Sequence, residues 1–254
     1  MILGIDHVVL ATADVDATAA ELERKLGLVA TGGGRHDALG TLNRLVWLGD
    51  AYLELVGVFD RRLASSSWLG RPVLDALERG GGLVTWAIAV ADLEDVMRWA
   101  PAGAWLGPIG GERRRPDGAV VRWRLARPEA LSATSPFLIE HDETAAEWTP
   151  AEREVRASEQ HPVGGSVRLA GLEVPAPSPA VSAGRLRSTL ALHAEPVGRR
   201  AVRLRVGEHE CQFSTPQAAA SPTVDLVADV NVRTRVARMG GCAIRVRGRP
   251  EPIG

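Results

Sequence analysis

The stretch Ile5-Asp6-His7-Val8-Val9-Leu10-Ala11-Thr12-Ala13-Asp14-Val15 recurs without a gap as Leu83-Val84-Thr85-Trp86-Ala87-Ile88-Ala89-Val90-Ala91-Asp92-Leu93. Each copy is an apolar run of strand length that ends at an aspartate, a residue that often caps the N-terminus of a helix. A helical stretch follows each copy, residues 17–26 closed by Gly27 and residues 94–100 closed by Pro101. The recurrence predicts two copies of one strand–helix unit.

Further strand candidates complete each copy. They are residues 42–48 and 52–56 in the first copy, and residues 119–127 and 138–141 in the second. The last strand of each copy carries one carboxylate, Glu54 in the first and Glu140 in the second. We therefore predict an α+β fold with paired βαβββ modules over residues 1–57 and 83–144. Residues 58–82 would link the modules through a short helix.

The composition changes near residue 150, because all seven tryptophans lie before it. Residues 145–165 are predicted to form a connector with a polar helix that begins at Thr149-Pro150-Ala151-Glu152, a capping box with proline at the first helical position. Residues 166–254 show a strand, a helix and a hairpin, but no residue that matches His7 or Glu54. We predict a reduced third module of βαββ type with a structural role.

The charge and hydropathy exclude several classes of protein. The 254 residues include 30 Lys and Arg against 31 Asp and Glu, a net charge of −1 that does not support binding to nucleic acid. No apolar run approaches the roughly 18 residues of a membrane span, and the first residues lack the pattern of a signal peptide. We therefore expect a cytoplasmic protein without membrane contact. Cys211 and Cys242 lack the spacing of metal ligands.

Several motifs together resemble the vicinal oxygen chelate superfamily and, within it, the glyoxalase-like domain proteins. They are Gly4–Val9, Gly33–His36, Gly40–Leu45, Leu48–Leu55, Gly81–Trp86 and Pro136–Glu140. The resemblance covers residues 4–142 and implies that the curved sheets of the two modules form a cup. It also implies divalent-metal ligands on the first and last strands of the modules. By this resemblance His7, Glu54 and Glu140 are the metal ligands, with Glu140 as the catalytic base.

The fourth ligand position departs from the family pattern. The recurrence places Thr85 opposite His7, and a threonine hydroxyl is a poor ligand for a transition metal. One imidazole and two carboxylates would still suit a divalent ion with open positions, and zinc, manganese, iron, nickel and magnesium are not distinguished. No nucleotide cofactor is expected, because neither glycine run has the context of a phosphate loop.

Other polar residues are predicted to shape the cup. In residues 119–127 the apolar side chains alternate with Arg122 and Arg124, so the arginines would point into the cup if the apolar face packs on helices. His36 and Asn43 lie in segments that the resemblance highlights, and we expect them to line the ligand site together with Thr85. His141 follows Glu140 directly and should point away from the metal. The basic run Arg113-Arg114-Arg115 is typical of a solvated hairpin.

Three hypotheses for function follow. The first is a divalent-metal-dependent lyase, isomerase or epimerase that acts on a small oxygen-bearing anionic substrate. The second is a metal-free protein that binds a small molecule in the same cup, as in sequestration or drug resistance. The third is a fold retained for assembly alone, and a homodimer is left open. The enzyme hypothesis predicts that His7, Glu54 and Glu140 converge within one chain.

Overall fold

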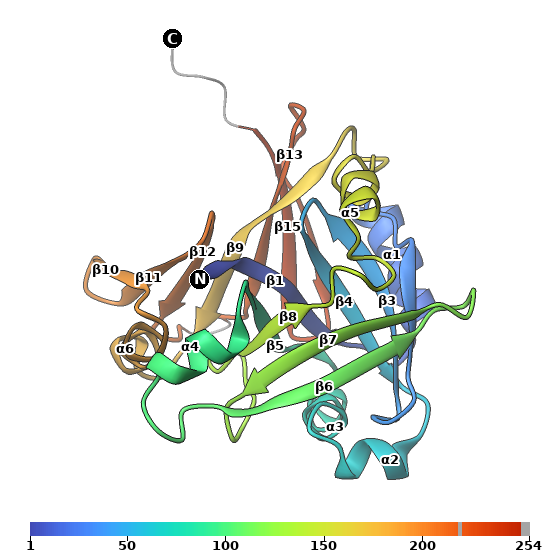
Figure 1. Cartoon of the computed structure of the whole chain (residues 1–254). Coiled ribbons are helices and arrows are strands. Elements are labelled where there is room, and N and C mark those ends of the chain that lie inside the picture. The colour runs from blue at the N-terminus through green and yellow to red at the C-terminus, as the bar shows by residue number, and fades with distance from the viewer. Residues whose placement is uncertain (218–219, 250–254) are drawn as a thin grey trace.

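The computed structural model describes residues 1–217 and 220–249. Two β-sheets lie side by side, one a closed eight-stranded barrel and the other an open seven-stranded sheet (Figure 1). Helices pack against both sheets. The predicted α+β class is confirmed.

Two βαβββ modules build the barrel, as predicted. The first contains β1 (Ile2–Ala11), α1 (Val15–Leu26), β2 (Gly32–His36), β3 (Thr41–Leu48) and β4 (Ala51–Val58). The second contains β5 (Gly82–Val90), α4 (Leu93–Trp99), β6 (Leu106–Arg114), β7 (Val120–Arg127) and β8 (Phe137–His141). Two short helices, α2 (Arg61–Ser66) and α3 (Gly70–Glu78), connect the modules.

The two modules share one topology. β4 pairs parallel with β1, and β8 pairs parallel with β5, so the strand orders are β1-β4-β3-β2 and β5-β8-β7-β6. The modules join along the antiparallel pair of β1 and β5. The other seam, between β2 and β6, is a single residue pair, Arg35 with Arg114. The barrel is therefore held firmly along one seam and loosely along the other.

The recurring aspartates start the first helix of each module. The Asp14 carboxylate accepts hydrogen bonds from the backbone nitrogens of Asp16 and Ala17, and Gly27 ends α1 with a φ of 70°. The Asp92 carboxylate accepts from the backbone nitrogen of Asp95 at 2.8 Å. Both caps predicted from the repeat are confirmed.

The second sheet repeats the module once in full and once in part. β9 (Val167–Pro175), α6 (Pro179–Leu190), β10 (His193–Val197), β11 (Ala201–Val206) and β12 (His209–Ser214) form a complete βαβββ unit. β13 (Thr223–Ala228), β14 (Arg235–Met239) and β15 (Cys242–Gly248) follow without a helix between them. The expected single reduced module is therefore a full third module and a reduced fourth. The third module was not recognised as complete, because its strand β10 is short and polar and shows too little apolar pattern in the sequence.

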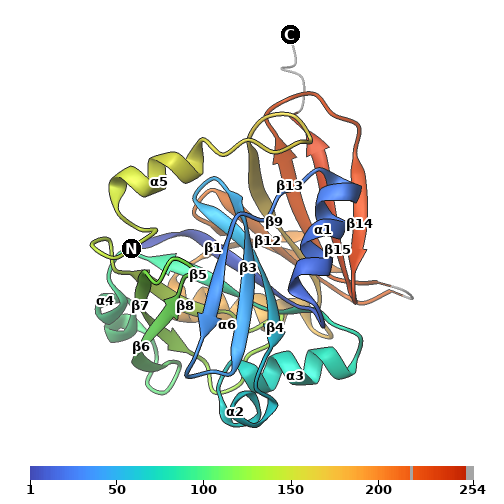
Figure 2. The same cartoon turned by 90° about the vertical axis from the view of Figure 1, so that its right-hand side faces the viewer.

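The strands of the barrel face two different cores. Val8, Leu10, Leu53 and Leu55 pack in one cluster with residues of the second sheet, whereas Val9 belongs to a separate cluster inside the barrel. Helix α1 packs against β14 of the second sheet and against β3 and β4 of the barrel, and it covers the first core (Figure 2). Because side chains alternate along a strand, this packing turns the neighbouring odd positions of β1 into the barrel.

The connector forms α5 (Pro150–Ala157), which begins at the predicted capping box. The backbone nitrogen of Glu152 donates to Thr149 Oγ1 at 3.4 Å. Within the described residues, no helix is long and apolar enough to cross a membrane.

Candidate functional site

The barrel encloses a cavity with a volume of about 40 Å³, which we call the inner chamber. Its polar walls come mainly from the first module: His7, His36, Asn43 and Glu54. Its aromatic walls come from both modules and the connector: Tyr52, Trp68, Trp123, Phe137 and Trp148. A buried ion pair of Arg113 and Glu147 completes the lining. Carboxylate, imidazole and amide groups thus meet in a site that is otherwise apolar.

A β-bulge in β1 brings Asp6 and His7 into contact. Ile5 pairs with Ile88 of β5 and His7 pairs with Ala87, so Asp6 is the extra residue. In a regular strand, Asp6 and His7 would point to opposite faces. Here Asp6 Oδ1 lies 2.5 Å from His7 Nδ1, and Asp6 Oδ2 lies 2.8 Å from His141 Nε2. One carboxylate therefore connects two imidazoles.

The two imidazoles keep Asp6 ionised. Burial raises the pKa of Asp6, but the charges and hydrogen bonds of His141 and His7 outweigh it and hold this pKa well below its usual value. An ionised carboxylate only accepts hydrogen bonds, so His7 Nδ1 and His141 Nε2 are both donors. In its neutral form His7 then carries its lone pair on Nε2, the nitrogen that faces Glu54.

Glu54 lies at the centre of the polar wall and is 5% exposed. Asn43 Nδ2 donates to Glu54 Oε1 at 2.6 Å. His7 Nε2 lies 3.7 Å from Glu54 Oε2, and His36 Nε2 lies 3.8 Å from Glu54 Oε1. Both separations are too long for a hydrogen bond. Burial lowers the pKa of His36 to about 4 against the opposing charge of Glu54, so the ring is neutral near neutral pH.

The aromatic side chains hold the imidazoles in place. The His7 ring stacks on Tyr52, with 4.6 Å between the ring centroids, and Phe137 contacts it edge-on at 5.4 Å. His141 stacks on Trp148 at 3.3 Å. Burial lowers the pKa of His141 against the opposing charge of Asp6. The rings are therefore fixed by packing as well as by hydrogen bonds.

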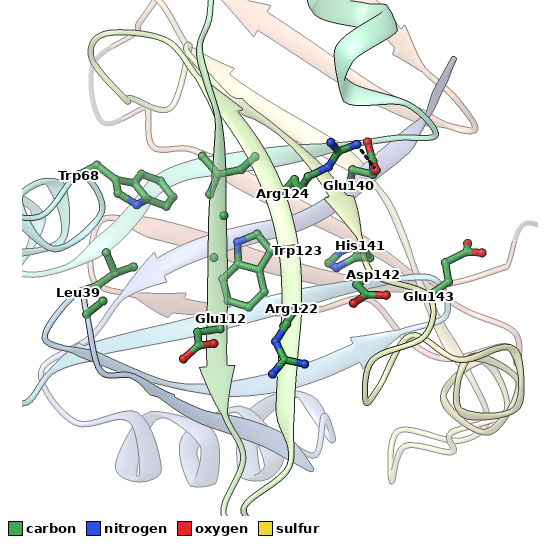
Figure 3. A pocket seen from close by; sticks show the side chains of 14 residues that line it. Leu39, Trp68, Glu112, Arg122, Trp123, Arg124, Glu140, His141, Asp142 and Glu143 are labelled. Atoms are coloured by element: carbon green, nitrogen blue, oxygen red, sulfur yellow. Dashed lines mark hydrogen bonds and ion pairs between the residues drawn. The ribbon is translucent and has the colours of Figure 1, made fainter.

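Trp123 separates the inner chamber from a larger hollow. This outer recess, with a volume of about 750 Å³, lies along β6, β7 and β8. Leu39, Trp68, Trp123 and His141 line both spaces, and Trp123 lies between Trp68 and His141 in Figure 3. Ligand atoms that extend beyond the inner chamber would reach the outer recess past the Trp123 indole.

Four residues predicted for the site line the inner chamber: His7, His36, Asn43 and Glu54. Glu140 does not join them. Its Oε2 accepts from the backbone nitrogen of Leu93 at 2.7 Å, and its Oε1 pairs with Arg124 at 2.7 Å (Figure 3). The prediction that His7, Glu54 and Glu140 converge is wrong. Glu140 cannot serve in the chamber as a metal ligand or as a base, because its carboxylate lies outside it.

The register of β8 explains this correction. Val9 pairs with Glu54 across β1 and β4, and its counterpart in the repeat, Ala87, pairs with Phe137 across β5 and β8. Phe137 is therefore the counterpart of Glu54, three residues before Glu140. The shift reverses the parity, so Glu140 points outward and His141 lines the chamber. Sequence reasoning separated these two side chains correctly but assigned them to the wrong faces.

Three further predictions are corrected. Thr85 is fully buried, donates from Oγ1 to the Ser135 carbonyl at 3.2 Å, and does not line the chamber. Arg122 and Arg124 are exposed, because the apolar face of β7 lines the barrel interior instead of packing on helices. These arginines therefore cannot bind an anionic group inside the barrel, contrary to the expectation from the sequence.

Sequence reasoning also missed Arg113, which was assigned to a solvated hairpin. It is 4% exposed, pairs with Glu147, and donates from Nη1 to the Gly33 carbonyl at 2.5 Å. Arg113 is the first of three consecutive arginines, and such a run of like charges predicts exposed side chains. Strand alternation along β6 is the signal that separates Arg113 from its neighbours.

The residues do not fit the predicted metal centre. Glu140 is directed away from the chamber, and Asn43 presents an N–H group to Glu54 Oε1. Among residues 1–217 and 220–249, no three His, Cys, Asp or Glu side chains are grouped so that they could hold a metal ion. The chemistry of the site is therefore derived from the side chains alone.

A family model for the glyoxalase-like domain matches residues 5–190. The chain belongs to the glyoxalase-like domain family. Its superfamily, the vicinal oxygen chelate superfamily, is the one that the sequence motifs resemble. A search among curated proteins gave no match.

Solved structures share the fold of this glyoxalase-like protein. A hypothetical protein from Staphylococcus aureus superposes with a TM-score of 0.79 at 15% identity, covering 98% of this chain and 100% of that one. A mutant of 4-hydroxymandelate synthase from Streptomyces coelicolor gives 0.59 at 11% identity, covering 100% and 95%. Methylmalonyl-CoA epimerase from Mycobacterium tuberculosis gives 0.39 at 23% identity, covering 55% and 88%. At these identities the similarity to the first two structures shows the fold alone, and nothing is concluded from the match to the epimerase.

Proposed function

We propose that this protein binds a small organic molecule in the inner chamber and transfers a proton on it. The observation that supports the proposal is the Asp6–His7–Glu54 arrangement, in which an ionised carboxylate orients an imidazole toward a second carboxylate. A histidine oriented in this way is a common general base. The aromatic walls exclude bulk water from it.

Each polar residue has a separate role in this proposal. His7 Nε2 accepts a proton from the carbon next to a carbonyl group of the ligand. Asp6 keeps the other nitrogen of the ring protonated and stabilises the imidazolium that forms. Glu54 lies 3.7 Å from His7 Nε2 and stabilises the same charge. Removal of such a proton is the first step of many isomerases, epimerases and lyases that act on carbonyl compounds.

The finer predictions change with the geometry. No step passes through a metal ion, because the residues of the chamber do not fit one. Arg122 and Arg124 line the outer recess and not the inner chamber, so neither arginine supports an anionic group inside the chamber. A cytoplasmic location and a homodimer stay predictions, and sedimentation of the purified protein tests the second.

Deuterium exchange tests the proposed reaction. A library of small carbonyl compounds is incubated with the protein in D₂O, and deuterium uptake by each compound is measured by mass spectrometry. We expect at least one compound to exchange with the wild type and about 100-fold more slowly with His7→Gln. The matched control is His193→Gln, because His193 is exposed on β10. If His7→Gln exchanges as fast as the wild type, the role of His7 is refuted.

A second candidate is sequestration of a small molecule without reaction. It is favoured by the second module, which places Phe137 at the position that corresponds to Glu54 and ties Thr85 to a backbone carbonyl. At these two positions the second module therefore offers no group that could transfer a proton to or from a ligand. A compound that binds in the chamber but gains no deuterium from the wild type would support this candidate.

A further inference from the structure

We infer that the ligand presents a protonated amine to the inner chamber, beside the buried Glu54 carboxylate. The inference rests on the proposed function for the location of the ligand and adds its chemical class. It is carried by the charges, the unpartnered acceptors and the aromatic walls of the chamber.

The Glu54 carboxylate has no Lys or Arg partner within the part of the chain that the structure describes, and the only basic groups there that approach it are the imidazoles of His7 and His36. The nearest guanidinium in the lining, that of Arg113, is held by Glu147 and by the Gly33 carbonyl. His36 is neutral, and its Nε2 lies 3.8 Å from Glu54 Oε1. A buried carboxylate without a cation is costly, and a cationic ligand would remove that cost.

A second buried acceptor belongs to Asn43, the residue that donates a hydrogen bond to Glu54. Asn43 must turn Nδ2 toward Glu54, because a carboxylate only accepts hydrogen bonds. This fixes Asn43 Oδ1 on the other side of the amide, where it is buried and has no partner. The Glu54 carboxylate and Asn43 Oδ1 are therefore acceptors with few hydrogen-bond donors around them, which is what an ammonium group requires.

The walls and the size of the chamber agree with this chemistry. Trp123 and Phe137 line the chamber without stacking face-on against an imidazole, and aromatic rings attract cations. A volume of about 40 Å³ has room for about three water molecules, which is enough space for an ammonium or methylammonium group. The rest of the ligand would extend past Trp123 into the outer recess.

Calorimetric titration with four probes tests the inference. The probes are benzylammonium, benzyl alcohol, benzoate and Mn²⁺, each added to the full-length wild type near neutral pH. We expect benzylammonium to bind at least about tenfold more tightly than benzyl alcohol or benzoate, because only the cation meets Glu54 and the aromatic faces favourably. Glu54→Gln, which has nearly the same shape, should abolish this preference and leave the affinity for benzyl alcohol unchanged.

A second variant and a folding control separate the effect of the Glu54 charge from a structural effect of the substitution. Glu54→Asp retains the charge and should retain part of the preference for the amine, whereas a merely structural role for Glu54 would not distinguish Asp from Gln. Circular dichroism confirms that each variant is folded. Failure of benzylammonium to bind, binding that Glu54→Gln leaves unchanged, or Glu54-dependent binding of Mn²⁺ alone would overturn the inference.

The test also separates the inference from the proposed function. If benzyl alcohol binds as tightly as benzylammonium, and Phe137→Ala weakens both, the chamber binds small molecules but does not select an amine. The proton-transfer proposal is then judged by deuterium exchange alone.

Discussion

Asp6 is the residue on which the chemistry of the chamber depends. It is 2% exposed and accepts hydrogen bonds from two imidazoles. Replacement by asparagine keeps the shape but removes the charge and puts an N–H group against one ring.

We expect Asp6→Asn to lower the free energy of unfolding by about 1.5–3 kcal/mol, the usual loss for a hydrogen bond to a charged group. We expect it to slow deuterium exchange about 100-fold, because His7 no longer holds its proton on Nδ1. Urea unfolding and the exchange assay measure the two effects. Unchanged exchange in a folded variant would contradict the role of Asp6.

His36 predicts how stability depends on pH. Burial lowers its pKa from 6.5 to about 4, with the charge of Arg113 in the same sense and that of Glu54 opposing it. The unfolded chain therefore binds a proton between pH 6.5 and about 4 that the folded chain does not bind.

Stability should accordingly fall as the pH drops from 6.5 to about 4, by up to about 3 kcal/mol from this group. In His36→Gln that part of the decrease should disappear, while His193→Gln should follow the wild type. Urea unfolding at a series of pH values measures the slopes. Equal slopes for His36→Gln and the wild type would contradict the prediction.

At the level of single residues, prediction succeeded where the local pattern was sufficient. His7 and Glu54 each interrupt an apolar run, and both line the chamber as expected. Glu140 shows the same local pattern and points outward, because its orientation depends on pairing with a distant strand. Arg113 was missed for a similar reason, since its partner Glu147 lies far along the chain.

At the level of elements, two adjacent glycines of β6, Gly110 and Gly111, shape the wall around Trp123. A Cβ atom on Gly111 would lie 2.3 Å from Trp123 Nε1, whereas a Cβ on Gly110 would meet no atom within 4 Å. The indole therefore occupies the space that a side chain on Gly111 would need.

We expect Gly111→Ala to displace Trp123, to lower the free energy of unfolding by about 1–3 kcal/mol, and to change the intrinsic fluorescence of the protein. Gly110→Ala is the matched control on the same strand and should leave both unchanged. Urea unfolding followed by fluorescence measures the two variants. Equal behaviour of Gly110→Ala and Gly111→Ala would show that Trp123 does not rest on β6 as described.

The elements themselves were largely predictable, because hydrophobic runs and helix caps are local. The sequence predicts the first strand and helix of both barrel modules from one recurring stretch, and the caps at Asp14 and Asp92 are confirmed. It does not reveal the bulge at Asp6, because nothing in the apolar run marks an extra residue. The contact between Asp6 and His7 depends on that bulge.

At the level of the whole molecule, the barrel depends on the second sheet for its outer core. Val8, Leu10, Leu53 and Leu55 pack in one cluster with Leu172, Ile244 and other residues of that sheet. The two sheets also share a hydrogen bond, from the Ile5 backbone nitrogen to His209 Nδ1 at 3.0 Å.

We expect the full chain to unfold in one cooperative transition, because this core is continuous. A fragment of residues 1–165 should expose the apolar face of β1 and β4 and should bind a hydrophobic dye or aggregate. Thermal unfolding with two probes, and dye binding by the fragment, measure these outcomes. A soluble fragment that unfolds cooperatively would show that the barrel is independent.

The bulge in β1 has a twin in β5. Val9 pairs with Thr85 and Leu10 with Leu83, so Val84, 78 residues after Asp6, is skipped in the same way. The second module therefore holds Val84, Thr85 and Phe137 at the positions that correspond to Asp6, His7 and Glu54, and all three are buried. The two modules thus share one backbone irregularity but fill it differently, with polar groups in the first module and mainly apolar groups in the second.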